Sequence, residues 1–336
     1  MDIRVAVIGA GSWGTTVAHL ATANAPTVLW ARDAALAADI EAGRGNQRYL
    51  PGFELNPELR ATSDIAEAVG LADVVAMAVP SHGFGDTLRY AADHLRPGVP
   101  IISLTKGFEQ GSRRRMTEII DEVLPGHPVG VLTGPNLARE ILAGHAAASV
   151  IAMADPAIAE SLQAVFAGGQ FRVYTNTDVV GAEVGGALKN VIAIASGIAD
   201  GLGAGDNARA ALITRGLAEM ARLGVAMGGE PMTFAGLAGM GDLVATCISP
   251  QSRNRHVGEQ LGSGRDIGDI VADMKMVAEG VKAAPVAVEL AAQHGIEMPI
   301  AQGVAAVCAG RCSAVDAYQG LLARSSRPEL YGLGGT

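Results

Sequence analysis

Residues 3–14 read IRVAVIGAGSWG, a short apolar run that leads directly into three glycines at the spacing G-x-G-x-x-G. A helical pattern follows from Thr15 to Asn24. In such a strand–turn–helix unit, Gly9 permits a tight turn, Gly11 lets the backbone approach a pyrophosphate, and Gly14 lets the helix pack against the strand. The N-terminus of the helix then faces the anion, so the sequence predicts a dinucleotide-binding turn.

The second predicted strand, Thr27–Trp30, is followed by two charged residues, Arg32 and Asp33. An acid at this strand tip binds the ribose 2′-hydroxyl of NAD, whereas an arginine suits the 2′-phosphate of NADP. Because Arg32 comes first, we predict that NADPH/NADP is accepted alongside NADH/NAD; a surface arginine in a turn is the alternative. We expect the backbone amides of Ser12 and Trp13, in the preceding turn, to point at the cofactor phosphates.

Strands and helices alternate as far as residue 174, and every later segment reads as helix. Alternation of this kind predicts an α/β fold with a Rossmann-like, doubly wound and mostly parallel sheet. We predict a dinucleotide-binding domain at residues 1–177 and an all-α substrate-binding and catalytic domain at residues 178–336. The predicted strands are 3–8, 27–30, 59–62, 74–79, 100–105, 129–133, 148–153 and 171–174, and the predicted helices between them are 15–24, 65–71, 87–95, 113–123 and 156–166.

Polar or conformationally special residues follow two of the predicted strands. Lys106 comes after one strand, and Gly134 and Asn136 come after another. Ligands of doubly wound sheets bind outside the carboxyl ends of the strands, so these positions are candidate site residues. Lys106 either holds a phosphate or carbonyl oxygen or is a solvated loop lysine.

Residues 183–200, EVGGALKNVIAIASGIAD, place one ammonium group inside an otherwise apolar helical run. Burial without a partner lowers the pKa of a lysine. Lys189 is therefore either paired, with Glu183 as the candidate acid, or used as a proton donor and acceptor. Gly185 and Gly186, one turn earlier, let a second backbone or a ligand approach closely.

Residues 249–256, SPQSRNRH, crowd polar groups at a predicted helix start. Ser252, Arg253 and Asn254 offer a hydroxyl, a guanidinium group and backbone amides to one phosphate, which the helix dipole also favours. A plain helix cap explains Ser252 but not both arginines, so we favour an anion site. Glu279 lies in a further pattern that, by itself, is ordinary helix capping.

Composition limits the class of protein. The chain has 336 residues, 49% of them hydrophobic, which is enough for two buried cores. A net charge of -9 argues against nucleic-acid binding. Glycines and Pro26 interrupt the uncharged run 5–31, and Asp2 stands where a signal peptide has basic residues. We therefore predict a cytoplasmic protein without membrane insertion. Cys247, Cys308 and Cys312 lack the further ligands of a zinc site, so we expect small core residues and no metal.

Seven motifs, in this order, resemble those of bacterial NAD(P)-dependent glycerol-3-phosphate dehydrogenases. One departure is Asn136 followed by Leu137, where many members have serine or threonine followed by phenylalanine. The motifs are GAGSWG at 9–14, KG at 106–107, GPNLARE at 134–140, EVGGALKN at 183–190, LAGMGDL at 237–243, SRN at 252–254 and AEG at 278–280.

The resemblance implies that dihydroxyacetone phosphate and sn-glycerol 3-phosphate are interconverted by hydride transfer. Lys189, oriented by Asp242 or Asn190, is then the catalytic proton donor and acceptor. The resemblance also implies a homodimer that supplies glycerol 3-phosphate for phospholipid biosynthesis. The implied substrate-binding residues are Lys106, Gly134, Asn136, Lys189, Asp242, Ser252, Arg253 and Asn254, and the implied cofactor-binding residues are Gly9, Gly11, Ser12, Trp13, Gly14, Arg32, Lys106, Ala138, Arg253, Val277 and Glu279.

Two other functions remain open. A reductase of the same architecture that acts on another small substrate, of the ketopantoate or sugar-acid type, would keep the glycine turn and Lys189 but would not need residues 252–254 for a phosphate. A regulatory module that binds NADPH without chemistry would explain the turn but not Lys189. Consumption of NADPH in the presence of dihydroxyacetone phosphate distinguishes the three.

Overall fold

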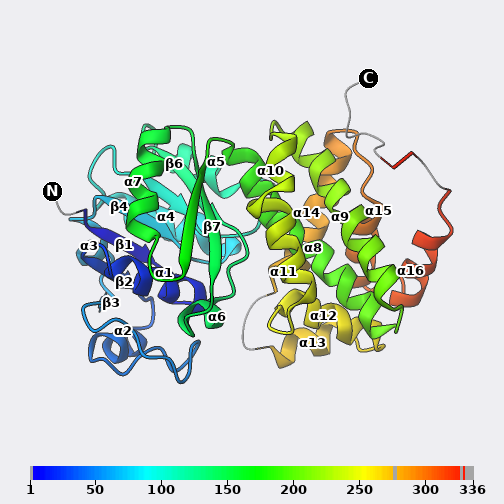
Figure 1. The fold of residues 1–336 in the computed structure, drawn as a ribbon, viewed down its shortest axis with the longest axis horizontal. Helices are drawn as coiled ribbons and strands as arrows, with labels where there is room; N and C mark the ends of the chain where they lie inside the picture. The colour runs from blue at the N-terminus through cyan, green and yellow to red at the C-terminus, as the bar shows by residue number, and fades with distance from the viewer. Residues whose placement is uncertain (1–2, 275–277, 326–327, 330–336) are drawn as a thin grey trace. The chain divides into compact units, whose positions relative to one another are not determined.

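The computed structural model describes residues 3–274, 278–325 and 328–329. The chain divides into two compact units, each of which is visible in Figure 1. Unit 1 comprises Met1–Thr105 and Arg114–Val179, and unit 2 comprises Lys106–Arg113 and Val180–Thr336. The sequence prediction assigns residues 106–113 to the N-terminal domain. In the structure this segment joins unit 2, and the side chain of Phe108 is buried in the helical core of that unit.

Unit 1 is built on an eight-stranded sheet in the order β3-β2-β1-β4-β5-β6-β7-β8. Neighbouring strands are parallel except for β6 and β7, which are antiparallel, so the last two strands run against the other six. The prediction of a mostly parallel, doubly wound sheet is therefore confirmed. The strands are β1 (Val5–Ile8), β2 (Thr27–Trp30), β3 (Arg60–Thr62), β4 (Val74–Met77), β5 (Ile101–Ser103), β6 (Val129–Thr133), β7 (Ala147–Met153) and β8 (Phe171–Asn176).

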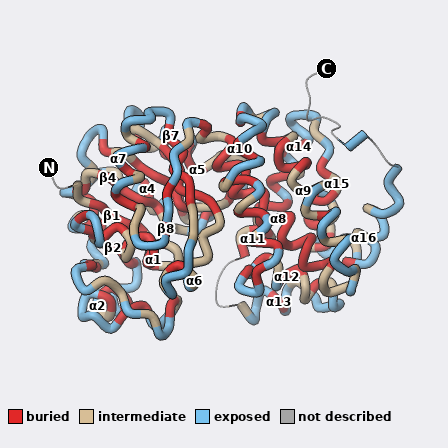
Figure 2. Tube along the Cα trace, viewed as in Figure 1, coloured by how far each residue is buried: buried red, intermediate tan, exposed pale blue. Residues whose placement is uncertain are grey.

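Helices cover both faces of this sheet because successive side chains of a strand point to opposite faces. Val5 and Val7 of β1 lie in one apolar core with α1, α2, α6 and α7, whereas Ala6 and Ile8 lie in a second core with α3, α4 and α5. Figure 2 shows the central strands as buried. The helices are α1 (Ser12–Thr22), α2 (Ala34–Glu41), α3 (Ile65–Val69), η1 (Ser81–Gly83), α4 (Phe84–Ala92), α5 (Met116–Val123), α6 (Ala138–Leu142) and α7 (Pro156–Phe166).

Unit 2 is helical wherever it has regular structure among its described residues, and its core surrounds α8 (Val179–Gly201). Residues 181–199 of α8 are all buried, as Figure 2 shows, and a helix that is apolar on every side belongs in a core. The other helices are α9 (Asp206–Ala226), α10 (Pro231–Ala235), η2 (Leu237–Gly241), α11 (Asp242–Ile248), α12 (Arg253–Gly262), α13 (Ile267–Asp273), α14 (Glu279–Gln293), α15 (Pro299–Cys308) and α16 (Ala314–Leu322).

Helix α8 is also the one helix, among the described residues, that is long and apolar enough to cross a membrane by length and composition. Of its apolar window, 89% is buried inside the protein. The core helix of a protein without a membrane span passes the same test, so this composition is weak evidence for a membrane span. The burial of α8 in the core of unit 2 accounts for its apolar composition.

Candidate functional site

The turn between β1 and α1 has the geometry that its glycines predict. Gly9 has a φ of +117°, in the region that favours glycine, and a Cβ there would lie 2.6 Å from the carbonyl oxygen of Ala78. A Cβ on Gly14 would lie 2.0 Å from the carbonyl oxygen of Gly9. By contrast, a Cβ on Gly11 would meet no protein atom within 4 Å. The turn is therefore closely packed at Gly9 and Gly14 and open at Gly11.

Helix α1 presents backbone amides at its N-terminus, because its N-cap residue is Gly11 and no side chain caps it. The indole nitrogen of Trp13, in the first turn, is buried and has no hydrogen-bond partner within the described part of the chain. The Trp13 ring packs edge-on against Phe171, with the ring centroids 6.3 Å apart. A buried donor without a partner is costly and is common where a ligand binds. The open, uncapped turn is suited to an anion, and the contacts of Ser12 and Trp13 with a pyrophosphate stay predictions.

Arg32 and Asp33 lie after β2 and have different roles in the structure. One carboxylate oxygen of Asp33 accepts hydrogen bonds from the backbone N–H groups of Ala35 and Leu36 as the N-cap of α2. The other lies 3.1 Å from the guanidinium group of Arg48. Asp33 already serves as a cap, so the exposed Arg32 stays the predicted partner of a 2′-phosphate.

The end of β6 carries the next group of predicted residues. Gly134 has a φ of +136°, and a Cβ there would lie 3.1 Å from the Cα of Ser149. The Ser149 hydroxyl donates to the carbonyl oxygen of Thr133 at 2.8 Å and lies 3.1 Å from the side-chain oxygen of Asn136. The amide nitrogen of Asn136 and the hydroxyl oxygen of Thr133 are buried and have no partner among the described residues. Unit 1 thus contains Gly9, Gly11, Ser12, Trp13, Gly14, Arg32, Gly134, Asn136 and Ala138 of the predicted site residues.

Unit 2 contains a buried cluster of charges around Lys189. The exposed fractions of Lys189 and Asp242 are 6% and 1%. The Nζ of Lys189 donates to Oδ1 of Asp242, and to the Thr246 hydroxyl at 2.8 Å. The Nζ of Lys106 donates to the other carboxylate oxygen of Asp242 at 2.7 Å. One carboxylate therefore joins two ammonium groups. The acid paired with Lys189 is Asp242, whereas the residues around Lys189 suggested Glu183.

The surroundings of Lys189 bring its pKa close to neutral pH. Burial lowers the pKa of Lys189 to about 7. Asp242 opposes this change by stabilising the ammonium form, whereas the like charge of Lys106 adds to it. An amine with this pKa is present in both protonation states near neutral pH, which is the requirement for a general acid and base.

Asp242 is positioned by an irregular helical turn. Residues 237–241 form the π-helical element η2, which leads directly into α11. Such turns redirect side chains and are frequent at functional sites. A Cβ on Gly185 of α8 would lie 2.7 Å from the carbonyl oxygen of Ala238 in η2. The close backbone approach predicted from the glycines before Lys189 is thereby confirmed for Gly185.

The polar stretch 249–256 forms the start of α12. The Ser252 hydroxyl accepts a hydrogen bond from the backbone N–H of Arg255, which makes Ser252 the N-cap. The Arg255 guanidinium group donates to Asp200 at 2.9 Å, so an ion pair within unit 2 accounts for it. The side chain of Arg253 reaches solvent, but partial burial lowers the pKa of its guanidinium group, and the Glu279 carboxylate opposes this change. The contact of Arg253 with an anion therefore stays a prediction.

The side chain of Asn254 is engaged within the protein. Its amide nitrogen donates to the side-chain oxygen of Asn190 at 2.9 Å, and its oxygen accepts from the backbone N–H of Gly280 at 2.9 Å. Asn190 in turn donates to the carbonyl oxygen of Lys106 at 3.1 Å. These bonds connect α8, α12, α14 and the segment after β5, so the Asn254 side chain positions helices. Val277, also predicted to contact the cofactor, lies outside the described residues.

Helices α8 and α12 cross with their backbones in contact. Each carries two glycines four residues apart, at 197 and 201 in α8 and at 258 and 262 in α12. A Cβ on Gly197 would lie 2.0 Å from the carbonyl oxygen of Arg255, and a Cβ on Gly258 would lie 2.0 Å from that of Ile194. The crossing therefore fixes the start of α12 relative to the helix that carries Lys189.

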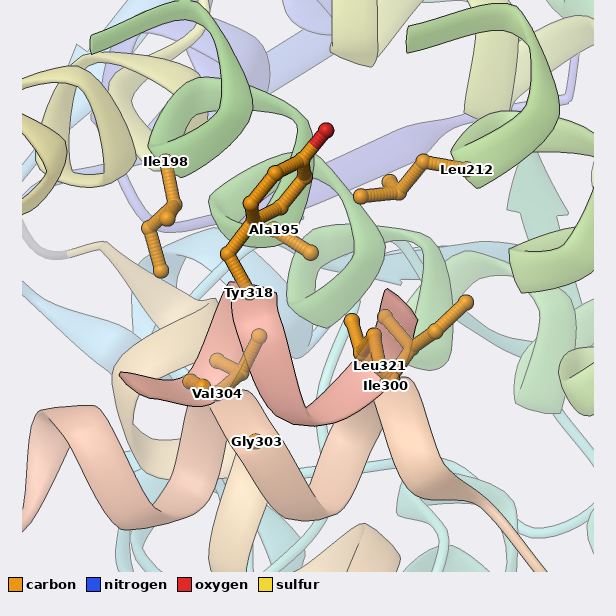
Figure 3. Close-up of a pocket in the computed structure, with 9 residues that line it drawn as sticks. Ala195, Ile198, Leu212, Ile300, Gly303, Val304, Tyr318 and Leu321 are labelled. Atoms are coloured by element: carbon orange, nitrogen blue, oxygen red, sulfur yellow. The ribbon is translucent and has the colours of Figure 1, made fainter. Parts of the chain in front are cut away.

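Unit 2 also contains a small apolar recess between α8, α9, α15 and α16, shown in Figure 3. Its free volume of about 20 Å³ is enough for about one water molecule. None of its lining side chains is charged, so the recess does not suit a phosphorylated substrate. The lining residues are Ala195, Ile198, Leu212, Ile300, Gly303, Val304, Ala317, Tyr318 and Leu321.

Comparison with known proteins bears on both units. Residues 4–159 match the family described as NAD-dependent glycerol-3-phosphate dehydrogenase N-terminus, and residues 178–319 match the corresponding C-terminus. The chain belongs to this family. A glycerol-3-phosphate dehydrogenase [NAD(P)+] of Sphingopyxis alaskensis is 62% identical over 98% of this chain and 99% of its own length. One of Mycobacterium avium is 54% identical over 98% and 97%.

A solved glycerol-3-phosphate dehydrogenase has the same fold. The crystal structure of the enzyme from Coxiella burnetii matches with a TM-score of 0.92 and 37% identity, covering 96% of this chain and 99% of that chain. The family resemblance inferred from the seven motifs is thereby confirmed.

Two polar contacts in unit 2 were not predicted from the sequence. Thr246 bonds to Lys189, and its spacing of four residues from Asp242, which places both on one helix face, was a usable signal. The bond between Asn190 and Asn254 joins residues 64 positions apart, and no local pattern predicts it.

Proposed function

We propose that the chain catalyses the NAD(P)-dependent interconversion of dihydroxyacetone phosphate and sn-glycerol 3-phosphate, with Lys189 as the proton donor and acceptor. The observation that carries this proposal is the buried Lys189 ammonium group, held between the Asp242 carboxylate and the Thr246 hydroxyl with a pKa of about 7. When bound, the nicotinamide cofactor supplies the hydride. Reduction of a ketone also requires a proton at the carbonyl oxygen, and Lys189 provides it.

Asp242 and Thr246 keep the Lys189 amine in one orientation. Thr246 donates its hydroxyl proton to the backbone carbonyl of Asp242 at 2.6 Å, so its oxygen is left to accept from Lys189. In the oxidation direction, neutral Lys189 removes the hydroxyl proton of glycerol 3-phosphate. In the reduction direction, its ammonium form returns that proton and stabilises the developing negative charge on oxygen.

The phosphate of the substrate is assigned to the start of α12. The Ser252 and Asn254 side chains are engaged within the protein. The proposed phosphate ligands are Ser252, Arg253 and Asn254, through the Ser252 hydroxyl, the Arg253 guanidinium group and the backbone N–H groups of the first helical turn, and the helix dipole favours an anion there. Lys106, beside Asp242, is the further cation proposed to contact the substrate.

The cofactor pyrophosphate is assigned to the β1–α1 turn of unit 1. The open space at Gly11 and the buried indole nitrogen of Trp13 support a pyrophosphate at the β1–α1 turn. Arg32 is the proposed partner of a 2′-phosphate. The other proposed cofactor residues are Gly9, Ser12, Gly14, Lys106, Ala138, Arg253, Val277 and Glu279, and the other proposed substrate residues are Gly134 and Asn136.

We further propose that the enzyme is a cytoplasmic homodimer that supplies glycerol 3-phosphate for phospholipid biosynthesis. The family resemblance supports the homodimer and the supply of glycerol 3-phosphate, and the interrupted apolar run 5–31 supports the cytoplasmic location. Sedimentation of the pure protein measures its mass directly, and a monomer mass at assay concentration would exclude the dimer.

The test of the reaction is direct. Pure protein is mixed with NADPH and dihydroxyacetone phosphate, and the loss of NADPH absorbance is followed. We expect turnover that requires the phosphate, so that unphosphorylated dihydroxyacetone is a poor substrate. Turnover only with a 2-keto acid would favour the ketopantoate-type or sugar-acid alternative, and NADPH binding without turnover of any ketone would favour the regulatory module.

A further inference from the structure

Asn46 is a fully buried polar side chain in the long loop of unit 1 that connects α2 to β3. Its amide nitrogen donates to the carbonyl oxygen of Ala10 at 2.9 Å and to the Thr15 hydroxyl oxygen at 2.8 Å. Its amide oxygen accepts from the backbone N–H of Tyr49 at 3.1 Å. Both donors and the acceptor of the amide are thus used, which fixes its orientation without ambiguity between nitrogen and oxygen.

The bond to Ala10 acts on the dinucleotide turn itself. A trans peptide unit is planar, so its C=O and the N–H of the next residue point in opposite directions. When Asn46 holds the Ala10 carbonyl on the protein side, the N–H of Gly11 points the other way. That N–H belongs to the residue whose surroundings are open, with no protein atom within 4 Å of a Cβ placed there. A carbonyl oxygen turned to that side would instead repel an anion.

A second contact ties the same loop to α1. The backbone N–H of Asn56 donates to Nδ1 of His19 at 2.9 Å. Thr15 and His19 are four residues apart, so the loop is bound to α1 at two successive turns. The Asn46 side chain therefore holds both the first turn of α1 and the Ala10–Gly11 peptide that precedes it.

We propose that Asn46 is a positioning residue for the cofactor pyrophosphate, which holds the Ala10–Gly11 peptide and the first turn of α1 with their N–H groups directed at the anion. This inference rests on the proposed function, because it takes the turn to bind a dinucleotide. It assigns to Asn46 a part in binding that neither the glycine motif nor the cofactor residues named above include.

The test measures ligand binding by calorimetry in the wild type, Asn46→Ala and a matched control, Asn24→Ala. The control also removes an amide that donates to two backbone carbonyl oxygens, those of Val165 and Ala167, in the same unit. Three ligands are used: NADPH, 2′-phospho-ADP-ribose, which keeps the pyrophosphate, and adenosine 2′-monophosphate, which lacks it.

We expect Asn46→Ala to raise the Kd of NADPH and of 2′-phospho-ADP-ribose about tenfold and to change that of adenosine 2′-monophosphate by less than about twofold. Asn24→Ala should leave all three unchanged. The proposal is overturned if Asn46→Ala binds the two pyrophosphate ligands as the wild type does, if all three ligands weaken equally, or if Asn24→Ala weakens them as much. Failure of the wild type to bind NADPH would instead refute the proposed function.

A second pair of variants keeps the test decisive if Asn46→Ala does not fold. Thr15→Ser keeps the hydroxyl that accepts from Asn46, whereas Thr15→Val removes it at nearly constant volume. We expect Thr15→Val, but not Thr15→Ser, to weaken the two pyrophosphate ligands selectively. Equal binding by the two Thr15 variants would overturn the proposal.

Discussion

The glycine turn of unit 1 and the lysine cluster of unit 2 are prepared for their ligands by opposite means. The turn omits side chains, so that backbone N–H groups at an uncapped helix start are available beside the open space at Gly11. The cluster buries charged side chains and lets one carboxylate, Asp242, hold both Lys106 and Lys189. Backbone amides do not titrate near neutral pH, whereas buried amines do.

The difference indicates how each region should respond to change. The turn should be sensitive to added volume and insensitive to pH. The cluster should be sensitive to charge and to pH, because the reaction depends on the protonation state of Lys189. Substitutions in the two regions and the pH dependence of the reaction test this contrast.

Replacement of Lys189 by methionine should separate chemistry from cofactor binding. Without the amine, no group delivers the proton, and we expect turnover to fall by about 10³-fold. The Kd of NADPH, measured by titration, should stay within about twofold of the wild type, because the turn lies in the other unit. The matched control is Lys282→Met in α14, which should retain turnover. Near-normal turnover in Lys189→Met would refute the catalytic assignment.

Gly14→Ala and Gly11→Ala should have different consequences although each adds one methyl group. At Gly14 the new Cβ would lie 2.0 Å from a backbone oxygen, so we expect a loss of about 2 kcal/mol or more in the free energy of unfolding. At Gly11 the methyl group meets no protein atom, so stability should change little while the Kd of NADPH rises about tenfold. Denaturant unfolding and calorimetry measure the two effects. A stable Gly14→Ala protein would contradict the packing described here.

The two reaction directions should depend on pH in opposite ways. Oxidation of glycerol 3-phosphate needs neutral Lys189, and burial lowers the pKa of that residue to about 7. Its kcat/KM should rise about tenfold per pH unit below about pH 7 and level off above it. Reduction needs the ammonium form, so its kcat/KM should fall above the same pH. Initial rates across this range test both, and a flat profile in both directions would argue against Lys189 as the titrating group.

Arg32→Gln should change cofactor preference rather than overall activity. Loss of the guanidinium group removes the proposed partner of the 2′-phosphate, so we expect the KM for NADPH to rise about tenfold and that for NADH to stay nearly constant. Arg48→Gln, which removes a nearby arginine paired with Asp33, is the control and should affect neither strongly. An equal rise for both cofactors in Arg32→Gln would exclude a role specific to the 2′-phosphate.

The elements of unit 1 were predictable from local patterns. The predicted ranges 27–30, 129–133 and 156–166 coincide with β2, β6 and α7. The reversal of β7 was not predictable, because alternation of strands and helices favours parallel neighbours and gives no sign of a single exception. Helix α2 was missed; its start depends on Asp33, which the sequence analysis considered only as a ribose ligand.

The site was predictable where chemistry is unusual and unpredictable where partners are distant. A lysine in an apolar helix predicts a buried amine that needs a partner or a catalytic role, and Lys189 is buried as expected. Its partner Asp242 lies 53 residues away, so the residues around Lys189 suggested only the nearer Glu183, and Asp242 was named through the family resemblance. Asn46 shows the same limit, since an asparagine in a polar loop gives no sign that it will be enclosed beside Ala10.

The backbone contact between α8 and α12 has a consequence for substrate size. With Gly197 and Gly258 each packed against a carbonyl group, neither helix can slide or rotate on the other without a clash. The spacing between the backbones that carry Lys189 and Arg253 is then a fixed property of unit 2. We therefore expect a phosphorylated ketone with one more carbon between its carbonyl group and its phosphate to be a poor substrate, because the two helices cannot move to fit it.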